Sequence, residues 1–328
     1  MESIKASTLP TISVILPTYN AEKDLKKCLD SIKMQDYPKD KLEILVIDGG
    51  SKDKTLEIAK KYKTTILFNP FRDCDEGKSI GLRHAKGEII ALIDADNELS
   101  SPQWFRTMIQ PLLEDKTIFG VASPWLMRED DPSINKYETL IKIADPLARR
   151  FHPQMEIIDK GSYVVYRAKL GDTPVVGANG FLWRRAVIDS VGGYEQKFEE
   201  VNFIARVISG GYLSYAEVKD VGIYHYYCTS IWSYIKKRVK IGRKFLGRKG
   251  RKQKTWVDHA NHDSFLLAVL YNISIIGPLF EAIGEYRKSG KVAWFWHPFI
   301  SWLTILVYGY AVIEYTVKKG FQTITAKE

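Results

Sequence analysis

Asp94 and Asp96 are the residues whose type and spacing point most directly to chemistry. They follow the apolar run 89–93, which predicts a strand buried on both faces that ends at the rim of a parallel sheet. In an extended strand both carboxylates would point to one side, and the small Ala95 between them would let a ligand come close. A hard divalent ion, Mg²⁺ or Mn²⁺, bridging to phosphate oxygens would relieve their mutual repulsion. The alternative is a solvated acidic turn.

Four strand–helix repeats position these carboxylates. Apolar runs predict strands at 12–16, 42–47, 65–68 and 89–93, each separated from the next by residues with helical character. Such repeats predict an α/β fold with a parallel, doubly wound sheet whose ligand site lies at the carboxyl ends of the strands. The loops 17–20, 48–51 and 94–96 follow three of these strands, so we expect them to converge.

The three loops lie in motifs that carry a family resemblance. Residues 16–20, 46–55 and 87–96 resemble, in order and spacing, the successive signatures of family 2 glycosyltransferases, and the similarity covers roughly residues 10–245. The resemblance implies the GT-A fold, a Rossmann-like mixed sheet that binds a nucleotide sugar. It also indicates similarity to membrane-attached polyprenyl- or dolichyl-phosphate sugar transferases.

By this resemblance the first two loops bind the nucleotide of the donor. Tyr19 would stack on the base, and Asp48 would accept a hydrogen bond from it. In the alternative interpretation Tyr19 is a packing residue and Asp48 caps the next helix. Gly49 stands where the family often has a second acid, which leaves only Asp48 for the base. The remaining donor contacts expected in these loops are Pro17, Thr18 and Asn20.

Charged side chains outside these loops complete the expected donor site. Lys78 and Arg83 lie on one predicted helix and would neutralise the diphosphate, unless they belong to a solvated helix face. By the resemblance, His225 stands where members often place a histidine near the metal, so Asp94, Asp96 and His225 are the expected metal ligands. A packed or exposed histidine is the alternative.

Two further motifs resemble the acceptor side of the family's site. Residues 175–185 predict a strand, a glycine-bounded turn and a second strand, and the resemblance places Asn179 and Gly180 on the pocket floor. A plain hairpin turn is the alternative. Glu199 and Glu200 align with the family's Glu-Asp motif, with Glu200 in the place of the catalytic Asp. A carboxylate at a helix N-terminus suits a general base, although an acidic first helical turn would look the same.

The length and composition of the chain limit its domain content and the compartment in which it is expected. The chain has 328 residues, 45% of them hydrophobic, enough for one large α/β domain and an appended region. Its three cysteines are widely spaced, so neither a zinc site nor a disulfide framework is indicated, and a reducing compartment is expected. Residues 1–10 are polar and lack the apolar core of a secretory signal. The pattern of strands and helices is less regular between residues 128 and 167, where an acceptor-specific insertion is expected.

The second half of the chain indicates a membrane. The net charge of +9 is uneven, because eleven Lys or Arg fall between 236 and 254 with no acid among them. Apolar residues interleaved from 231 onward predict a basic amphipathic helix lying on anionic lipid, with nucleic acid as the competing partner. The weakly charged stretch 264–283 and the uncharged stretch 292–313 predict two transmembrane helices, which favours lipid. A re-entrant hairpin kinked at Gly277–Pro278 and a buried soluble helix pair are the alternatives.

These patterns predict a catalytic domain over 1–229, a juxtamembrane segment over 230–260 and a membrane hairpin over 261–328. The positive-inside rule places the catalytic domain on the cytoplasmic face of the cell membrane. The expected function is inverting, metal-dependent sugar transfer to a polyprenyl phosphate, a lipid-linked sugar or a glycerolipid of the cell envelope. An essential Glu200 would favour a hydroxyl acceptor. A processive synthase, whose Gln-x-x-Arg-Trp motif is missing near the membrane, and an inactive scaffold are the alternatives, and the oligomeric state is left open.

Overall fold

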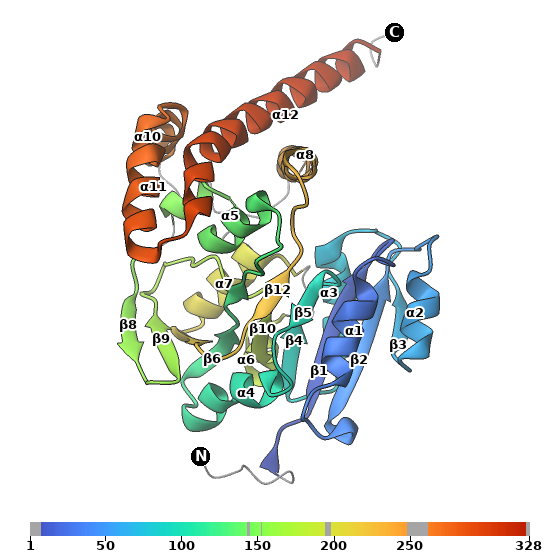
Figure 1. The fold of residues 1–328 in the computed structure, drawn as a ribbon. Coiled ribbons are helices and arrows are strands. Elements are labelled where there is room, and N and C mark those ends of the chain that lie inside the picture. Colours follow the sequence, from blue (N-terminus) through green and yellow to red (C-terminus); the bar gives the residue numbers. More distant parts are fainter. Residues whose placement is uncertain (1–7, 143–144, 152, 194–197, 248–261, 326–328) are drawn as a thin grey trace. The chain divides into compact units, whose positions relative to one another are not determined.

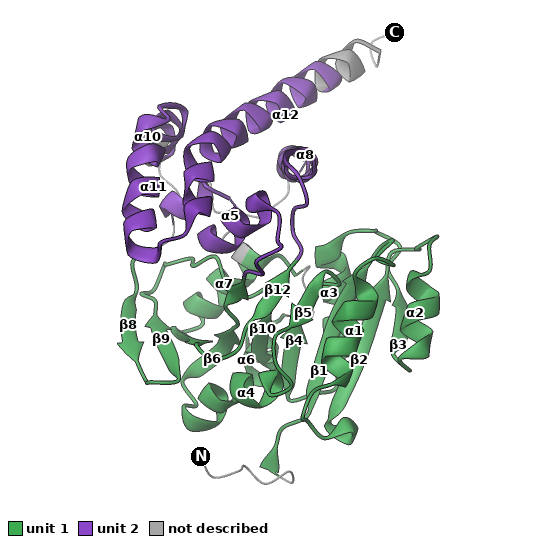
Figure 2. Cartoon of the chain, viewed as in Figure 1, with its two compact units in different colours: residues 1–126, 153–225 green, residues 127–152, 226–328 purple. Residues whose placement is uncertain are grey.

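The computed structural model describes residues 8–142, 145–151, 153–193, 198–247 and 262–325 (Figure 1). The chain forms two compact units (Figure 2). Unit 1 consists of residues 1–126 and 153–225, and unit 2 of residues 127–152 and 226–328. Unit 2 therefore takes in part of the stretch where the sequence predicts an insertion. Residues 248–260 of the predicted juxtamembrane segment lie outside the described residues. The bounds of the three predicted domains remain predictions.

Unit 1 is built on a mixed sheet with the strand order β3-β2-β1-β4-β10-β6-β11-β9-β8. The first four strands in this order are parallel, and β10 enters antiparallel between β4 and β6. Its strands are β1 (Ile12–Thr18), β2 (Leu42–Asp48), β3 (Thr65–Phe68), β4 (Ile89–Leu92), β6 (Ile118–Ala122), β8 (Glu156–Asp159), β9 (Tyr163–Arg167), β10 (Phe181–Arg184) and β11 (Ser214–Val218). The α/β mixed-sheet prediction is confirmed.

Helices cover both faces of this sheet because its central strands alternate apolar side chains between two cores. In β1, Val14 and Leu16 join the core under α1 (Leu25–Lys33), α2 (Thr55–Lys61) and α4 (Trp104–Glu114). Ile15 joins the opposite core, under α3 (Cys74–His84), α6 (Arg185–Ser190) and α7 (Glu200–Ser209). A short 3-10 helix, η2 (Lys39–Lys41), leads into β2.

A second, three-stranded sheet in unit 1 has the order β5-β12-β7. It joins β5 (Asn97–Leu99), β12 (Ile223–His225) and β7 (Trp125–Leu126). Its register pairs His225 with Asn97, three residues after Asp94. This pairing brings a histidine from late in the chain to the loop that follows β4.

The strand predicted at 175–176 is wrong. Val175 lies in a bend and Val176 in irregular backbone, and the Val176 amide donates to Pro174 O at 3.1 Å instead of to a neighbouring strand. The chain then passes through Gly177 at φ +111° and reaches β10, the second predicted strand. The glycine-bounded turn therefore connects a loop to a strand, and it is not a hairpin.

Unit 2 is helical in its described part. It contains α5 (Ser133–Ile141), η3 (Ala148–Phe151), α8 (Ile231–Gly247), α10 (His262–Ile273), α11 (Ile276–Ser289), η4 (Val292–Trp296) and α12 (His297–Thr325). Every fourth residue of α8 is buried, namely Tyr234, Arg238, Gly242 and Leu246. A Cβ added at Gly242 would lie 3.0 Å from the Ala311 Cβ, so α8 and α12 cross closely at that point.

Of the two transmembrane helices predicted from the sequence, one is matched by a long apolar stretch in the described residues, and the other stays a prediction. Among the described helices, one stretch, Val292–Lys318, is long and apolar enough to cross a membrane by itself. The first predicted helix is broken into α10 and α11, which are bent by 80°. The break lies at Ser274–Ile275, where Ile275 has φ +60°, and not at Gly277–Pro278. Pro278 falls in the first turn of α11, where its missing N–H is not needed.

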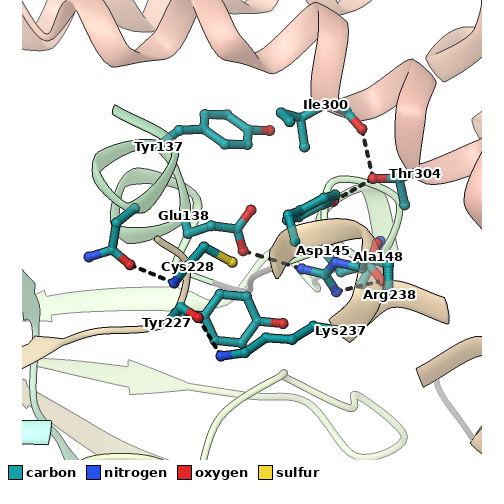
Figure 3. Close-up of polar contacts among 12 residues, drawn as sticks. Tyr137, Glu138, Asp145, Ala148, Tyr227, Cys228, Lys237, Arg238, Ile300 and Thr304 are labelled. Atoms are coloured by element: carbon teal, nitrogen blue, oxygen red, sulfur yellow. Dashed lines mark hydrogen bonds and ion pairs between the residues drawn. The ribbon is translucent and has the colours of Figure 1, made fainter. Parts of the chain in front are cut away.

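A buried ionic network joins three parts of unit 2 (Figure 3). The Arg238 guanidinium on α8 lies 3.2 Å from Glu138 of α5 and 3.4 Å from Asp145. Tyr308 of α12 donates to Asp145 at 2.5 Å. Burial raises the pKa of Glu138 to about 7, although the positive charge of Arg238 opposes that shift. The network therefore fastens the inserted residues 127–152 to the C-terminal helices.

Candidate active site

The loop after β2 is organised by Asp48. Its Oδ2 accepts from the amides of Gly50 and Ser51 at 2.8 Å each, and its Oδ1 accepts from Thr18 Oγ1 at 3.0 Å. Asn20 joins this loop to the tip of β1, because its amide donates to Ser51 Oγ at 2.8 Å. Asp48, Thr18 and Asn20 are thus brought together as predicted, and these hydrogen bonds hold the loop.

Tyr19 lies on the surface of these loops. It is 48% exposed, its ring packs over Gly49, and the Arg72 guanidinium lies 5.7 Å from the ring centroid. A Cβ at Gly49 would lie 3.2 Å from Tyr19 Cδ2, so the small residue allows the ring to lie close to the loop. Pro17 lies beneath, packed against Gly77 of α3. An exposed aromatic face at a strand end is suited to stacking on a planar ligand.

Asp94 and Asp96 do not lie in an extended strand. β4 ends at Leu92, and the Asn97 amide donates to Asp94 O at 3.0 Å, which closes a turn over residues 94–97. Because side chains alternate only along extended backbone, the strand argument does not set the directions of the two carboxylates. Ala95 is buried in this turn. Each carboxylate instead contacts a different partner.

Asp94 is paired with Lys78 of α3. The Lys78 side chain is 5% exposed, and its Nζ lies 3.3 Å from Asp94 Oδ1. Burial alone lowers the pKa of Lys78, but negative charge, chiefly that of Asp94, outweighs it and the pKa is raised. The ammonium therefore stays protonated in the interior at neutral pH.

Glu200 begins α7 close to this pair. The start of α7 is tied to α3 by the Phe198 amide, which donates to Ser79 Oγ at 2.7 Å. Burial raises the pKa of Glu200 to about 7, while the positive charge of Lys78 lowers it and the negative charges of Asp75 and Asp94 add to the rise. A carboxylate that titrates near neutral pH, at the positive end of a helix, can accept a proton from a substrate hydroxyl.

Asp96 is paired with His225 of β12. The His225 Nε2 lies 3.5 Å from Asp96 Oδ1, and the imidazole packs edge-on against Trp125 at 4.7 Å between ring centroids. The structure therefore brings together two of the three residues that were predicted as metal ligands. Within the described residues, however, no group of three or more His, Cys, Asp or Glu side chains is arranged to hold a metal ion.

The turn before β10 lies over the end of β4. The Gly180 amide donates to Leu92 O at 2.9 Å, and Asn179 Oδ1 accepts from the Asp94 amide at 3.4 Å. The Asn179 Nδ2 is buried and has no hydrogen-bond partner among the described residues. Gly180 has φ +66°, and a Cβ there would lie 2.6 Å from Ile223. Asn179 thus contacts the acidic turn, and Gly180 contacts the end of β4 just before that turn.

Two predicted residues have other surroundings. Glu199 is buried, and its Oε2 accepts from Asn202 Nδ2 at 2.8 Å within α7. Arg83 is exposed in the last turn of α3, about 7.5 Å further along the helix than Lys78. Helix α3 runs away from the strand ends, because the residue Gly87 that follows it donates its amide to Ser13 near the start of β1. The structure therefore does not bring Arg83 to the other site residues.

Three neighbours of the site were not predicted from the sequence. Cys74 Sγ lies 3.9 Å from Asp94 Oδ1, Asn97 Oδ1 accepts from the Asp94 amide at 3.1 Å, and Trp125 packs on His225. Asn97 directly follows the acidic pair, so its turn-forming tendency was a readable signal. The other two are brought in by tertiary contacts that no local pattern predicts.

Comparison with known proteins decides the family. The family model described as "Glycosyl transferase family 2" matches residues 13–187, which include the motifs around Asp48, Asp94 and Asp96. This chain belongs to glycosyl transferase family 2. It is 17% identical to the mannosyltransferase PcManGT from Pyrobaculum calidifontis, solved with GDP-Man and Mn²⁺, with a TM-score of 0.54 over 93% of this chain and 87% of the other. That likeness supports the GT-A fold.

Two curated relatives share part of the family region. Glycosyltransferase AglE of Haloferax volcanii is 41% identical over 96 residues, 27% of this chain and 32% of the relative. A Methanococcus voltae enzyme named dolichyl N-acetyl-alpha-D-glucosaminyl phosphate 3-beta-D-2,3-diacetamido-2,3-dideoxy-beta-D-glucuronosyltransferase is 36% identical over 91 residues, 26% of this chain and 28% of the relative. The chain thus matches about a third or less of the length of either relative.

Proposed function

We propose that this chain is a metal-dependent, inverting glycosyltransferase that moves a sugar from a nucleotide sugar to the hydroxyl group of a lipid-linked acceptor. The observation that carries the proposal is Glu200, a carboxylate with a pKa of about 7 at a helix start, beside the buried Lys78 and Asp94. Family membership and the names of the relatives support sugar transfer, and the dolichyl-linked acceptor of the Methanococcus relative supports a lipid-linked one.

The donor is proposed to lie along the strand ends. Its base would stack on the exposed face of Tyr19, beside Arg72, with the loop held by Asp48 supplying backbone groups. Its diphosphate would lie over the acidic turn near Lys78, whose protonated ammonium offers charge-assisted hydrogen bonds. The buried Asn179 Nδ2 supplies one more donor group there.

The side chains near the acidic turn offer ligand atoms that suit a hard divalent ion. Carboxylate oxygen and imidazole nitrogen are ligands that Mn²⁺ accepts, and Mg²⁺ accepts the oxygens. Asp96 Oδ1 and His225 Nε2, 3.5 Å apart, are close enough to share one cation, and we propose them as ligands with Asp94 nearby. When bound, the ion would supply positive charge to the leaving diphosphate. PcManGT was solved with Mn²⁺, which supports this choice.

The proposed reaction is a single in-line displacement. The acceptor hydroxyl gives its proton to Glu200 while its oxygen forms a bond to the anomeric carbon. The bond from that carbon to the diphosphate oxygen breaks, and the nucleoside diphosphate leaves with the electron pair. Lys78 offsets the negative charge that develops on the leaving group. Attack opposite to the leaving group inverts the anomeric configuration.

The site is proposed to work at the cytoplasmic face of the cell membrane, where a lipid-linked acceptor would present its hydroxyl. The apolar stretch Val292–Lys318 and the six cations of 236–244 support attachment to lipid. The test is a screen of nucleotide sugars with Mn²⁺ for thermal stabilisation, followed by transfer assays on lipid-linked acceptors that end in a hydroxyl or in a phosphate. Transfer to the phosphate that survives Glu200→Gln would contradict the hydroxyl assignment.

A further inference from the structure

The long apolar helix α12 is accompanied by a polar helix over much of its length. Three residues along one side of α12 contact α8, namely Thr304, Ala311 and Glu314. Tyr234 shares a hydrogen bond of 2.5 Å with Thr304, Gly242 packs on Ala311, and the Arg243 guanidinium binds Glu314 through contacts of 2.7 and 2.9 Å. Acyl chains therefore cannot surround α12 between residues 304 and 314.

The helix that lies against α12 is unsuited to the hydrocarbon core. α8 carries six cations between residues 236 and 244, and Lys236 and Lys240 are exposed on one face together with Trp232. A single Lys or Arg at the centre of a bilayer costs about 2.5–3.5 kcal/mol on insertion scales. Since α8 and α12 are packed together in one compact unit, the half of α12 beside α8 has to stay out of the acyl region.

Neither helix of the bent pair α10–α11 is long enough to span the hydrocarbon core alone, and the pair is apolar at its bend. At about 1.5 Å per residue the two helices measure about 18 and 21 Å, against about 30 Å for the hydrocarbon core. Large apolar side chains around the bend are 41–71% exposed, namely Leu270, Ile273, Ile275, Ile276, Leu279 and Phe280. The exposed cations Arg287 and Lys288 follow about 17 Å further along α11. Such a segment can reach into one leaflet with its cations at the headgroups.

We propose that unit 2 docks on a single leaflet and does not cross the membrane. The α10–α11 bend inserts among the acyl chains, and Arg287 and Lys288 contact anionic headgroups. α8 and the second half of α12 remain on the cytoplasmic side. This rests on the membrane attachment in the proposed function, and it replaces the two spanning helices expected from the sequence with a one-sided anchor.

Positions 291 and 318, at the two ends of the apolar stretch Val292–Lys318, provide the deciding measurement. Lys291→Cys and Lys318→Cys, in the full chain expressed in bacterial cells, are labelled with a membrane-impermeant maleimide in spheroplasts and in inverted vesicles, and the labelled cysteine is found by mass spectrometry. Both positions should label in inverted vesicles only, as should the native, exposed Cys74. Labelling of position 291 or 318 from the outer face, or of neither until detergent is added, would overturn the proposal.

The role of the bend is tested by flotation of the purified protein with vesicles of phosphatidylglycerol and phosphatidylcholine. Ile276→Gln with Phe280→Gln should weaken binding roughly tenfold or more. Leu170→Gln is the matched control, because Leu170 is 70% exposed in unit 1. Unchanged binding with loss of self-association would assign the bend to a second copy and overturn the proposal. If the unmodified chain ignores vesicles, the membrane attachment itself fails, while metal-dependent transfer to a detergent-solubilised acceptor still tests the enzymatic part.

Discussion

The Lys78 ammonium lies 3.3 Å from the Asp94 carboxylate, and its charge also lowers the pKa of Glu200. One buried cation is therefore shared by a proposed donor-binding group and the proposed base. If Lys78 is removed, burial and the negative charge of Asp94 still raise the pKa of Glu200, and the positive charge of Lys78 no longer opposes them.

Lys78→Met should therefore move the pH–rate profile of sugar transfer upward, by about one pH unit, in addition to slowing the reaction. The measurement is the rate at saturating acceptor between pH 5.5 and 9. A slower enzyme with an unmoved profile would mean that Lys78 does not influence the base. Lys86→Met is a suitable control, because that lysine is exposed near the other end of α3.

Glu200→Gln should reduce transfer to a hydroxyl acceptor by about 10²–10⁴-fold, because the amide cannot take the proton. In the unmodified enzyme the rate should rise with pH up to about 7 and then level off, since only the deprotonated form acts as base. Binding of the nucleotide sugar, followed by calorimetry, should change little. An equal loss of binding would indicate a structural role for Glu200.

Asp96→Ala should abolish the stabilisation that Mn²⁺ adds to nucleotide-sugar binding. For the unmodified protein, ligand at 100 times its dissociation constant should add about 2.7 kcal/mol to the free energy of unfolding. Thermal melting with the nucleotide sugar, with and without Mn²⁺, makes the comparison. Asp220→Ala, at an exposed position in unit 1, should keep the full effect of the metal.

Gly180→Ala should destabilise unit 1 more than Gly171→Ala, although both glycines have positive φ. Left-handed backbone costs an alanine about 1–2 kcal/mol in either case. At Gly180 the new Cβ would also lie 2.6 Å from Ile223, whereas nothing lies within 4 Å of the Cβ position at Gly171. Melting temperatures of the two variants give the difference, and equal losses would show that the contact with Ile223 relaxes.

Arg238→Met should lower the free energy of unfolding by about 3–5 kcal/mol, because it leaves Glu138 and Asp145 buried without their cation. Arg243→Met is the control, since solvent screens its ion pair with Glu314 and such surface pairs contribute little to stability. Denaturant unfolding in detergent measures both. Similar losses for the two variants would mean that the buried network adds nothing beyond a surface pair.

Much of unit 1 was readable from local patterns. The apolar runs at β1, β2, β3 and β4 are bounded by polar loops, and parallel strands separated by helices place those loops at one edge of the sheet. Local patterns predict less where the backbone departs from a regular strand or helix. The Asn97 amide donates to Asp94 O and folds residues 94–97 into a turn, and the break between α10 and α11 lies at Ser274–Ile275, without glycine or proline.

The pairings within the site could not be read locally. Lys78 reaches Asp94 from a helix, and His225 reaches Asp96 only through the three-stranded sheet that joins β5, β12 and β7. Residue type alone predicts Lys78 and Arg83 equally as cations for the diphosphate. Only Lys78 lies beside the acidic turn, because the orientation of α3 is set by packing and not by its own sequence.

The inserted residues 127–152 have a practical bearing on how this protein is divided for biochemical work. A chain ended after His225, designed to obtain the sugar-transfer portion alone, would still carry α5 with Glu138 and Asp145 but would lack Arg238 and Tyr308. Two acids that the intact chain encloses would then meet solvent next to newly uncovered apolar side chains. A shortened form with a short glycine–serine bridge in place of 127–152 should stay dispersed where the simple truncation aggregates.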